Sequence, residues 1–147
     1  MDKAERLALV LSSSLLVVFL SSVVFAVVHY DIGLPTCITS MEPFVDGEVI
    51  EHAEGRYEVH MLAMMWEFEP DELEFPQGST VDLYLTSDDV LHGFQIQGTN
   101  VNLMAVPGTV NYARVRFDEP GDYRVVCHEF CGSEHHDMMA TIRIEAE

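Results

Sequence analysis

The chain has 147 residues, of which 25 are acidic and 7 are Lys or Arg, so its formal net charge at pH 7 is −18. This length allows one domain of ordinary size, and so negative a chain repels phosphate backbones, so we expect no nucleic-acid partner. The acidic residues also repel one another, and molar salt, with a Debye length of about 3 Å, removes most of that repulsion. The composition indicates a halophile-like acidic surface, with an acidic face for one basic partner as the alternative.

The first predicted element is an uncharged apolar run over residues 7–28. It is long enough to cross a bilayer and longer than the apolar core of a cleaved signal peptide, which has about 7–15 residues. We therefore expect a single, retained transmembrane helix. Lys3 and Arg6 precede it, and no Lys or Arg follows it before Arg56. The positive-inside rule then predicts that residues 1–6 are cytoplasmic and that the rest of the chain lies on the outer face of the cell membrane.

Residues 29–55 are rich in Pro, Gly, Thr and acids without periodicity, and we expect an extracytoplasmic tether there. Residues 56–147 show short apolar alternations separated by turn signals such as Pro-Gly. Seven strands are predicted, at 57–62, 80–85, 93–97, 101–106, 112–117, 123–126 and 140–145. Short strands at this spacing are typical of a β-sandwich or barrel, so the outer domain is predicted to be all-β.

Four soft donors lie close together before the last predicted strand: Cys127, Cys131, His135 and Met138. Thiolate and thioether ligands select copper(I) and zinc over hard cations, and a Cys, His and Met set is typical of copper electron-transfer sites. His92 lies just ahead of another predicted strand. Because a β-sandwich gathers its loops at its two ends, His92 can reach the same site.

The number of metals stays open at this point. One copper would take His92, Cys131, His135 and Met138 as a blue-copper set and leave Cys127 unused. Two metals bridged by both thiolates would each receive one histidine, with Met138 and a backbone carbonyl as the weak axial donors. A disulfide between the two cysteines, or a Cys₂His₂ zinc site, is the third possibility.

The cysteine loop resembles the binuclear copper A loop of cytochrome c oxidase subunit 2, whose pattern is Cys-x-Glu/Gln-x-Cys-x-x-x-His-x-x-Met. Five residues match it in register: Cys127, Glu129, Cys131, His135 and Met138. The segment DVLHGF, which contains His92, is similar to the upstream ligand segment of that family. The resemblance covers the membrane helix and the whole β-domain. A single helix and a short tether resemble the B-type haem-copper oxidases.

The resemblance implies a cupredoxin-like Greek-key β-sandwich over residues 56–147 that holds two copper ions. The chain would be an enzyme subunit without catalytic residues of its own. It would take electrons from a cytochrome c or a small blue-copper protein and pass them to haem in subunit 1, where oxygen is reduced. The backbone carbonyl of Glu129 would be a copper ligand, and its side chain could hold magnesium at the subunit 1 interface. A nitric oxide reductase subunit and a membrane-anchored mononuclear copper carrier are the alternatives.

Other residues carry secondary expectations. Many family members have two tryptophans where electrons enter, whereas this chain has one in all, Trp66, which is therefore the candidate. Asp88 or Asp89 is expected to accept the remaining ring N–H of His92, as carboxylates commonly do behind histidine ligands. Cys37 has no evident partner and is expected to be an incidental thiol.

Overall fold

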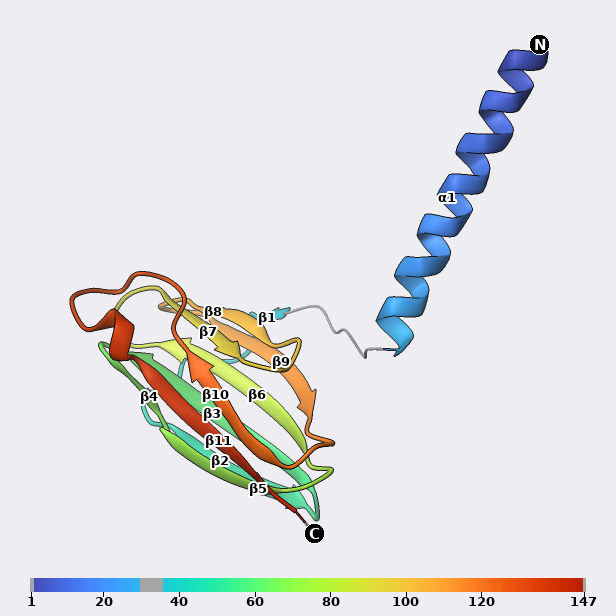
Figure 1. Cartoon of the computed structure of the whole chain (residues 1–147). Helices are drawn as coiled ribbons and strands as arrows, with labels where there is room; N and C mark the ends of the chain where they lie inside the picture. The colour runs from blue at the N-terminus through green and yellow to red at the C-terminus, as the bar shows by residue number, and fades with distance from the viewer. Residues whose placement is uncertain (1, 30–35, 147) are drawn as a thin grey trace. The chain divides into compact units, whose positions relative to one another are not determined.

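The computed structural model describes residues 2–29 and 36–146, and the chain divides into two units, a helix and a β-domain (Figure 1). The helix α1 spans Lys3–His29 and is long and apolar enough to cross a membrane. It buries none of its side chains within the described residues. The predicted helix over residues 7–28 is thus confirmed as a helix and a candidate span, while its orientation stays a prediction.

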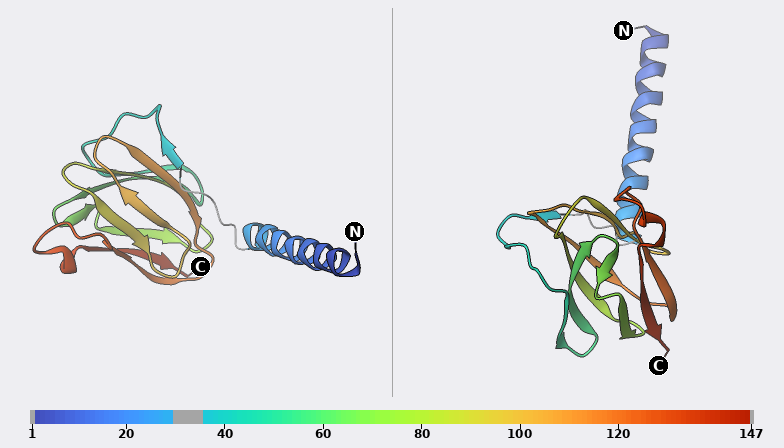
Figure 2. Two further views of the ribbon diagram at one scale, coloured as in Figure 1. Left: turned by 90° about the horizontal axis from the view of Figure 1, so that it is seen from above. Right: turned by 90° about the vertical axis from the view of Figure 1, so that its left-hand side faces the viewer.

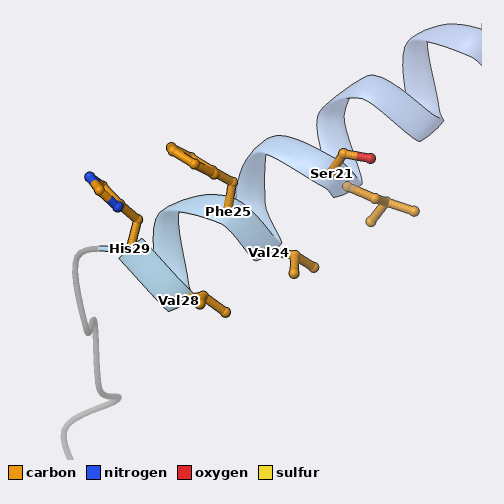
Figure 3. Close-up of a pocket in the computed structure, with 6 residues that line it drawn as sticks. Ser21, Val24, Phe25, Val28 and His29 are labelled. Atoms are coloured by element: carbon orange, nitrogen blue, oxygen red, sulfur yellow. The ribbon is translucent and has the colours of Figure 1, made fainter.

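The last turns of α1 form a shallow apolar groove (Figure 3), lined by Leu20, Ser21, Val24, Phe25, Val28 and His29. The rings of Phe25 and His29 stack there with their centroids 5.1 Å apart. Elsewhere in the helix, the hydroxyls of Ser12 and Ser22 donate to backbone carbonyls three or four residues earlier. These hydroxyls are satisfied within the helix itself, as a hydrocarbon environment requires.

The β-domain consists of two sheets (Figures 1 and 2). The first has the order β1-β9-β6-β3-β2, with β4 also paired to β3; its strands are β1 (Thr36–Ile38), β2 (Glu48–Ala53), β3 (Arg56–Met64), β4 (Glu67–Glu69), β6 (Thr80–Ser87) and β9 (Val110–Arg116). The second has the order β5-β11-β10-β7-β8, with β5 (Glu72–Pro76), β7 (His92–Ile96), β8 (Asn102–Ala105), β10 (Gly121–Val126) and β11 (Met139–Glu145). A short 3₁₀-helix, η1 (His135–Asp137), precedes β11. The predicted two-sheet sandwich is confirmed.

The core forms where alternating side chains of the two sheets meet. In β6, Val81, Leu83 and Leu85 are almost fully buried, whereas the residues between them point outward and are half-buried. Phe68 and Phe94 join the two sheets through an edge-to-face contact with centroids 5.3 Å apart. Fully burying such a side chain contributes about 1.5–3 kcal/mol, so this period-two alternation determines which face of each strand packs inward.

All seven predicted strands are present, but the expectation of an irregular tether over residues 29–55 is corrected. Strands β1 and β2 lie within that range, at opposite edges of the first sheet, while residues 30–35 lie outside the described residues. The physical reason is their position. Edge strands with mostly exposed side chains, such as β2, do not need the apolar alternation by which strands are recognised.

The segment between β1 and β2 adds a contact over the first sheet. Because these strands lie at opposite edges, the chain between them crosses from one edge to the other. Phe44 in this segment stacks on the ring of His60 in β3, with centroids 4.8 Å apart. The His60 ring also lies within hydrogen-bonding distance of Glu48 and Glu58. His60 therefore has the structural role that a histidine within a strand suggests.

Candidate metal centre

The cysteine loop connects two neighbouring strands of the second sheet. Strands β10 and β11 are antiparallel, and their last paired residues are Val126 and Met139, so the loop leaves the sheet and returns to it at one place. The backbone N–H of Cys127 donates to the carbonyl of Met138 at 3.2 Å and closes the loop. Strand β7, which begins at His92, pairs with β10 on its other side. Figure 1 shows the loop at the end of the domain away from the C-terminus.

The donor atoms of the loop converge. The Sγ atoms of Cys127 and Cys131 are 3.8 Å apart, and both cysteines are free thiols. The Cys131 Sγ lies 3.5 Å from Nδ1 of His135 and 3.7 Å from Sδ of Met138. The ligand atoms of His92, Cys127 and Cys131 all lie within 4.8 Å of one another.

The remaining predicted residue, Glu129, presents its backbone to the same group. Its carbonyl oxygen lies 3.2 Å from the Cys127 Sγ. Its side chain is about half exposed and points toward solvent and the His128 ring, 3.9 Å away. The structure therefore brings together all six residues predicted from the sequence, and their roles as ligands stay a prediction.

The group is buried although it is close to the surface. His92 is 0% exposed, Met138 1% and Cys131 6%. Burial, followed by the neighbouring Cys127, raises the pKa of the Cys131 thiol to about 11. The Cys131 thiol therefore stays protonated at neutral pH, and a metal ion that binds to it would displace its proton. The donor chemistry therefore fits a soft metal ion.

Asp89 orients the histidine from the upstream segment. The Nε2 of His92 lies 2.7 Å from Oδ1 of Asp89, while Nδ1 is buried and has no hydrogen-bond partner among the described residues. Burial alone would raise the pKa of Asp89, but hydrogen bonds from His92 and from two backbone N–H groups lower it. The ionised carboxylate accepts a hydrogen bond from Nε2–H, so Nδ1 keeps its lone pair for a metal. Of the two candidates, Asp89 and not the exposed Asp88 makes this contact.

Two glycines allow the loop to pack closely, and sequence reasoning did not single them out. A Cβ at Gly132 would lie 2.8 Å from Nε1 of Trp66, and the φ angle of +133° disfavours any side chain there. A Cβ at Gly93 would lie 2.5 Å from the ring of His128. Trp66 thus packs on the backbone beside Cys131, and its buried Nε1 has no partner within the described chain.

An exposed apolar spot lies around the loop. The side chain of Phe130 is 81% exposed, and its ring centroid lies 5.9 Å from that of His135. Three further apolar side chains are exposed beside the site: Met65, which precedes Trp66, and Val90 and Leu91, which precede His92. The acids Asp88, Glu134 and Asp137 are exposed in the same loops. Single exposed apolar residues leave no periodic signal, so the sequence did not predict this spot.

Comparison with known proteins identifies the family. The family described as cytochrome C oxidase subunit II, periplasmic domain, matches residues 55–146, more than half of the chain. The chain belongs to the cytochrome c oxidase subunit II family. It is thus a subunit of a cytochrome c oxidase, a haem-copper terminal oxidase.

Two relatives match this chain over almost all of their own length, and a third shows the same fold. Cytochrome c oxidase subunit 2 of a Thermus thermophilus strain is 32% identical over 153 residues, which cover 96% of this chain and 91% of the relative. A chain of a haem-copper terminal oxidase dimer solved by cryo-electron microscopy is 49% identical and superposes with a TM-score of 0.84. The match covers 97% of this chain and 100% of that chain. The periplasmic domain of subunit II from Bradyrhizobium japonicum is 20% identical and has the same fold, with a TM-score of 0.57. That match covers 61% of this chain and 84% of the other.

The site of this subunit II is consistent with the family's copper A centre. A buried histidine, which has one ring nitrogen without a partner in the described chain, lies within 4.8 Å of two free thiols, and a second histidine and a thioether approach from the loop. This His, Cys and Met group supports a role in electron transfer.

Proposed function

We propose that this subunit II holds a binuclear copper A centre, receives electrons from an external carrier and passes them to haem in subunit 1 for oxygen reduction. The observation that carries the proposal is the pair of buried thiols 3.8 Å apart, with His135 Nδ1 3.5 Å from the Cys131 Sγ and a His92 nitrogen within 4.8 Å of both Sγ atoms. His92 and His135 would each serve one copper. Met138 and the Glu129 carbonyl would supply the weak axial donors.

The second thiol favours two coppers over one. A mononuclear blue-copper site would leave Cys127 unused. Yet this thiol is buried next to Cys131 and lies 3.2 Å from the Glu129 carbonyl, where a second ion would need a donor. A copper pair that shares one electron over two metals and two sulfurs changes its bond lengths little on reduction, which lowers the reorganisation cost of electron transfer.

The exposed spot around Phe130 is suited to a donor protein. An apolar centre with acidic side chains nearby favours a partner that has an apolar patch and a basic rim, such as a cytochrome c or a small blue-copper protein. Trp66, packed against the backbone next to Cys131, is the aromatic side chain through which we expect electrons to enter.

The remaining assignments concern the membrane and subunit 1. With Lys3 and Arg6 on the cytoplasmic side, α1 would anchor the β-domain at the outer face of the cell membrane. The half-exposed carboxylate of Glu129 would then be available for a magnesium ion shared with subunit 1.

The test is copper loading of the full-length chain in detergent. We expect two coppers per chain and the multi-line electron paramagnetic resonance of a delocalised pair. Cys127→Ser should lose both features, whereas Cys37→Ser, which changes the exposed thiol outside the site, should keep them. One copper per chain with a blue-copper spectrum, unchanged by Cys127→Ser, would contradict the proposal.

The family assignment favours the oxidase over the nitric oxide reductase subunit that the sequence left as an alternative. Purification of the chain with its natural subunit 1 distinguishes the two. Oxygen consumption by the complex, with its haem content, supports the oxidase; nitric oxide reduction without oxygen consumption supports the alternative.

A further inference from the structure

One carboxylate connects two parts of the site that lie in different sheets. Oδ1 of Asp89 lies 2.7 Å from Nε2 of His92, at the start of β7 in the second sheet. Oδ2 of the same carboxylate accepts the backbone N–H of Met65 at 2.7 Å, just after β3 in the first sheet. Met65 is followed directly by Trp66. The two oxygens of Asp89 therefore hold the histidine and the tryptophan segment at once.

The histidine depends on this contact for its tautomer. The His92 ring is fully buried, and only its Nε2 has a hydrogen-bond partner among the described residues. An ionised carboxylate can only accept, so the proton stays on Nε2. Without Asp89 the proton could move to Nδ1, the ring nitrogen that has no partner among the described residues.

The tryptophan segment depends on the other oxygen. The indole of Trp66 packs on Gly132, directly after Cys131. The Nε1 of Trp66 makes no hydrogen bond within the described residues, so that ring is held by packing and by the backbone that carries it. The bond from Met65 N–H to Asp89 fixes this backbone.

We propose that Asp89 is a positioning residue that couples His92 to the Trp66 segment, so that ligand and ring keep one relative placement. The contacts form a closed circuit, which runs through Asp89, His92, the cysteine loop, Trp66 and Met65 back to Asp89. The inference deepens the proposed function and rests on it only in calling His92 a ligand. The coupling itself is a property of the metal-free chain.

The full-length, metal-free chain in detergent offers a direct readout, because Trp66 is its only tryptophan. Asp89→Ala removes both hydrogen bonds. It should increase quenching of the Trp66 fluorescence by acrylamide and replace the single His92 tautomer, seen by nitrogen-15 NMR, with a mixture. Asp89→Asn keeps one acceptor oxygen for donors on both sides, which are His92 Nε2, Val90 N–H and Met65 N–H, so one of the two readouts should change. Asp88→Asn alters the adjacent exposed acid and should change neither.

The outcomes separate the coupling from simpler roles. If Asp89→Ala changes the His92 tautomer but leaves Trp66 quenching at the wild-type value, or the reverse, Asp89 supports one side only and the coupling is wrong. Ser87→Ala removes another contact to Asp89 but leaves the carboxylate in place. It therefore tests whether general loosening of this loop is enough to change Trp66 quenching and the His92 tautomer. Equal changes in Ser87→Ala and Asp89→Ala would also overturn the coupling.

Copper binding gives the third readout. Loss of a carboxylate behind a histidine ligand typically weakens metal affinity about 10–100-fold, and we expect this for Asp89→Ala. If the wild-type chain binds no copper while both metal-free readouts change, the proposed function fails and the coupling stands. If copper binds in the wild-type chain and Asp89→Ala changes no readout, the coupling fails and the proposed function stands.

Discussion

The indole of Trp66 lies against the backbone of Gly132, so that a Cβ at position 132 would be 2.8 Å from Nε1 of the indole. Gly132 follows Cys131 directly and has a φ angle of +133°. Both the contact and the backbone conformation therefore require glycine at this position. The loop that carries the thiols and the aromatic ring are thus fitted to each other.

Replacement of Gly132 by alanine should destabilise the fold and displace Trp66. Overpacking of this kind typically costs about 1–3 kcal/mol, in addition to the strain of a side chain at positive φ. Gly121→Ala is the matched control, since Gly121 has a φ angle of +142° but no described atom within 4 Å of its Cβ position. Thermal unfolding and Trp66 emission should change more in Gly132→Ala. If both variants lose the same stability, backbone strain alone explains the loss and the contact with Trp66 contributes nothing.

Met138→Leu should keep the fold and the copper but change the reduction potential. The Met138 side chain is almost fully buried, and its Sδ lies 3.7 Å from the Cys131 Sγ. A volume-conserving exchange in a core usually costs less than about 1.5 kcal/mol. If Met138 is a copper ligand as proposed, loss of the thioether removes a weak donor of the kind that tunes the potential of such sites. Weaker donation disfavours copper(II), so the potential should rise. Redox titration measures the shift, and an unchanged potential would exclude Met138 as a ligand.

The carboxylate of Asp82 should determine part of the pH dependence of stability. On the outer face of the first sheet it accepts hydrogen bonds from Arg114, at 2.7 and 3.0 Å, and from the hydroxyl of Tyr112. Burial alone would raise the pKa of Asp82, but these hydrogen bonds lower it overall. A lowered pKa in the folded state stabilises the protein above the unfolded pKa of about 3.9. That contribution is lost as pH falls through the lower, folded value.

At alkaline pH the stability contributed by the same cluster is lost as pH rises, the reverse of its behaviour in acid. Burial, followed by the hydrogen bond to Asp82, raises the pKa of Tyr112 to about 12. This contribution is complete below the unfolded pKa of about 10 and is lost as pH rises toward the folded value. Asp82→Asn should therefore lower the free energy of unfolding by about 1–3 kcal/mol near neutral pH and flatten both limbs of the stability profile. Denaturant unfolding between pH 3 and pH 11 tests this, and parallel profiles for both proteins would contradict it.

The sequence predicted the parts of the fold that depend on burial. Strands such as 80–87 alternate because one of their faces enters the core, and that period is visible in the residues themselves. Four strands escaped prediction: 36–38, 48–53, 67–69 and 72–76. The first two lie at sheet edges and bury little. The other two bury Phe68, Leu73 and Phe75, but they are only three and five residues long, too short for a clear periodic pattern.

The candidate site was predictable to a similar extent. The residues of the loop that the structure brings together could be predicted from their spacing, because they lie within twelve residues and their donor atoms have distinct chemistry. The choice between Asp88 and Asp89 could not, since neighbouring acids differ only in the direction their side chains take in the folded loop. The packing of Trp66 on Gly132 joins residues 66 apart in the sequence, and no local pattern encodes such a contact.

Salt should stabilise the β-domain strongly. With a net charge of −18 in 147 residues, like charges repel across most of its surface. Raising potassium chloride from about 0.1 M to 1 M shortens the Debye length from about 10 Å to 3 Å. The melting temperature should therefore rise steeply with salt and level off near molar concentration. Sucrose, which stabilises without screening, is the control; an equal rise with sucrose would argue against charge repulsion as the cause.

Phe130→Ser should slow electron uptake from the donor without altering the copper centre. The ring is 81% exposed, so its loss should change stability by no more than about 0.5 kcal/mol. If the ring docks a donor, its removal should weaken the encounter complex by about 1 kcal/mol or more, as for interface residues that contribute to affinity. Val45→Ser, which alters another strongly exposed apolar residue (72%), is the matched control. Stopped-flow reduction of the copper-loaded chain by cytochrome c or a blue-copper protein measures the rate, and similar rates in both variants would place the docking surface elsewhere.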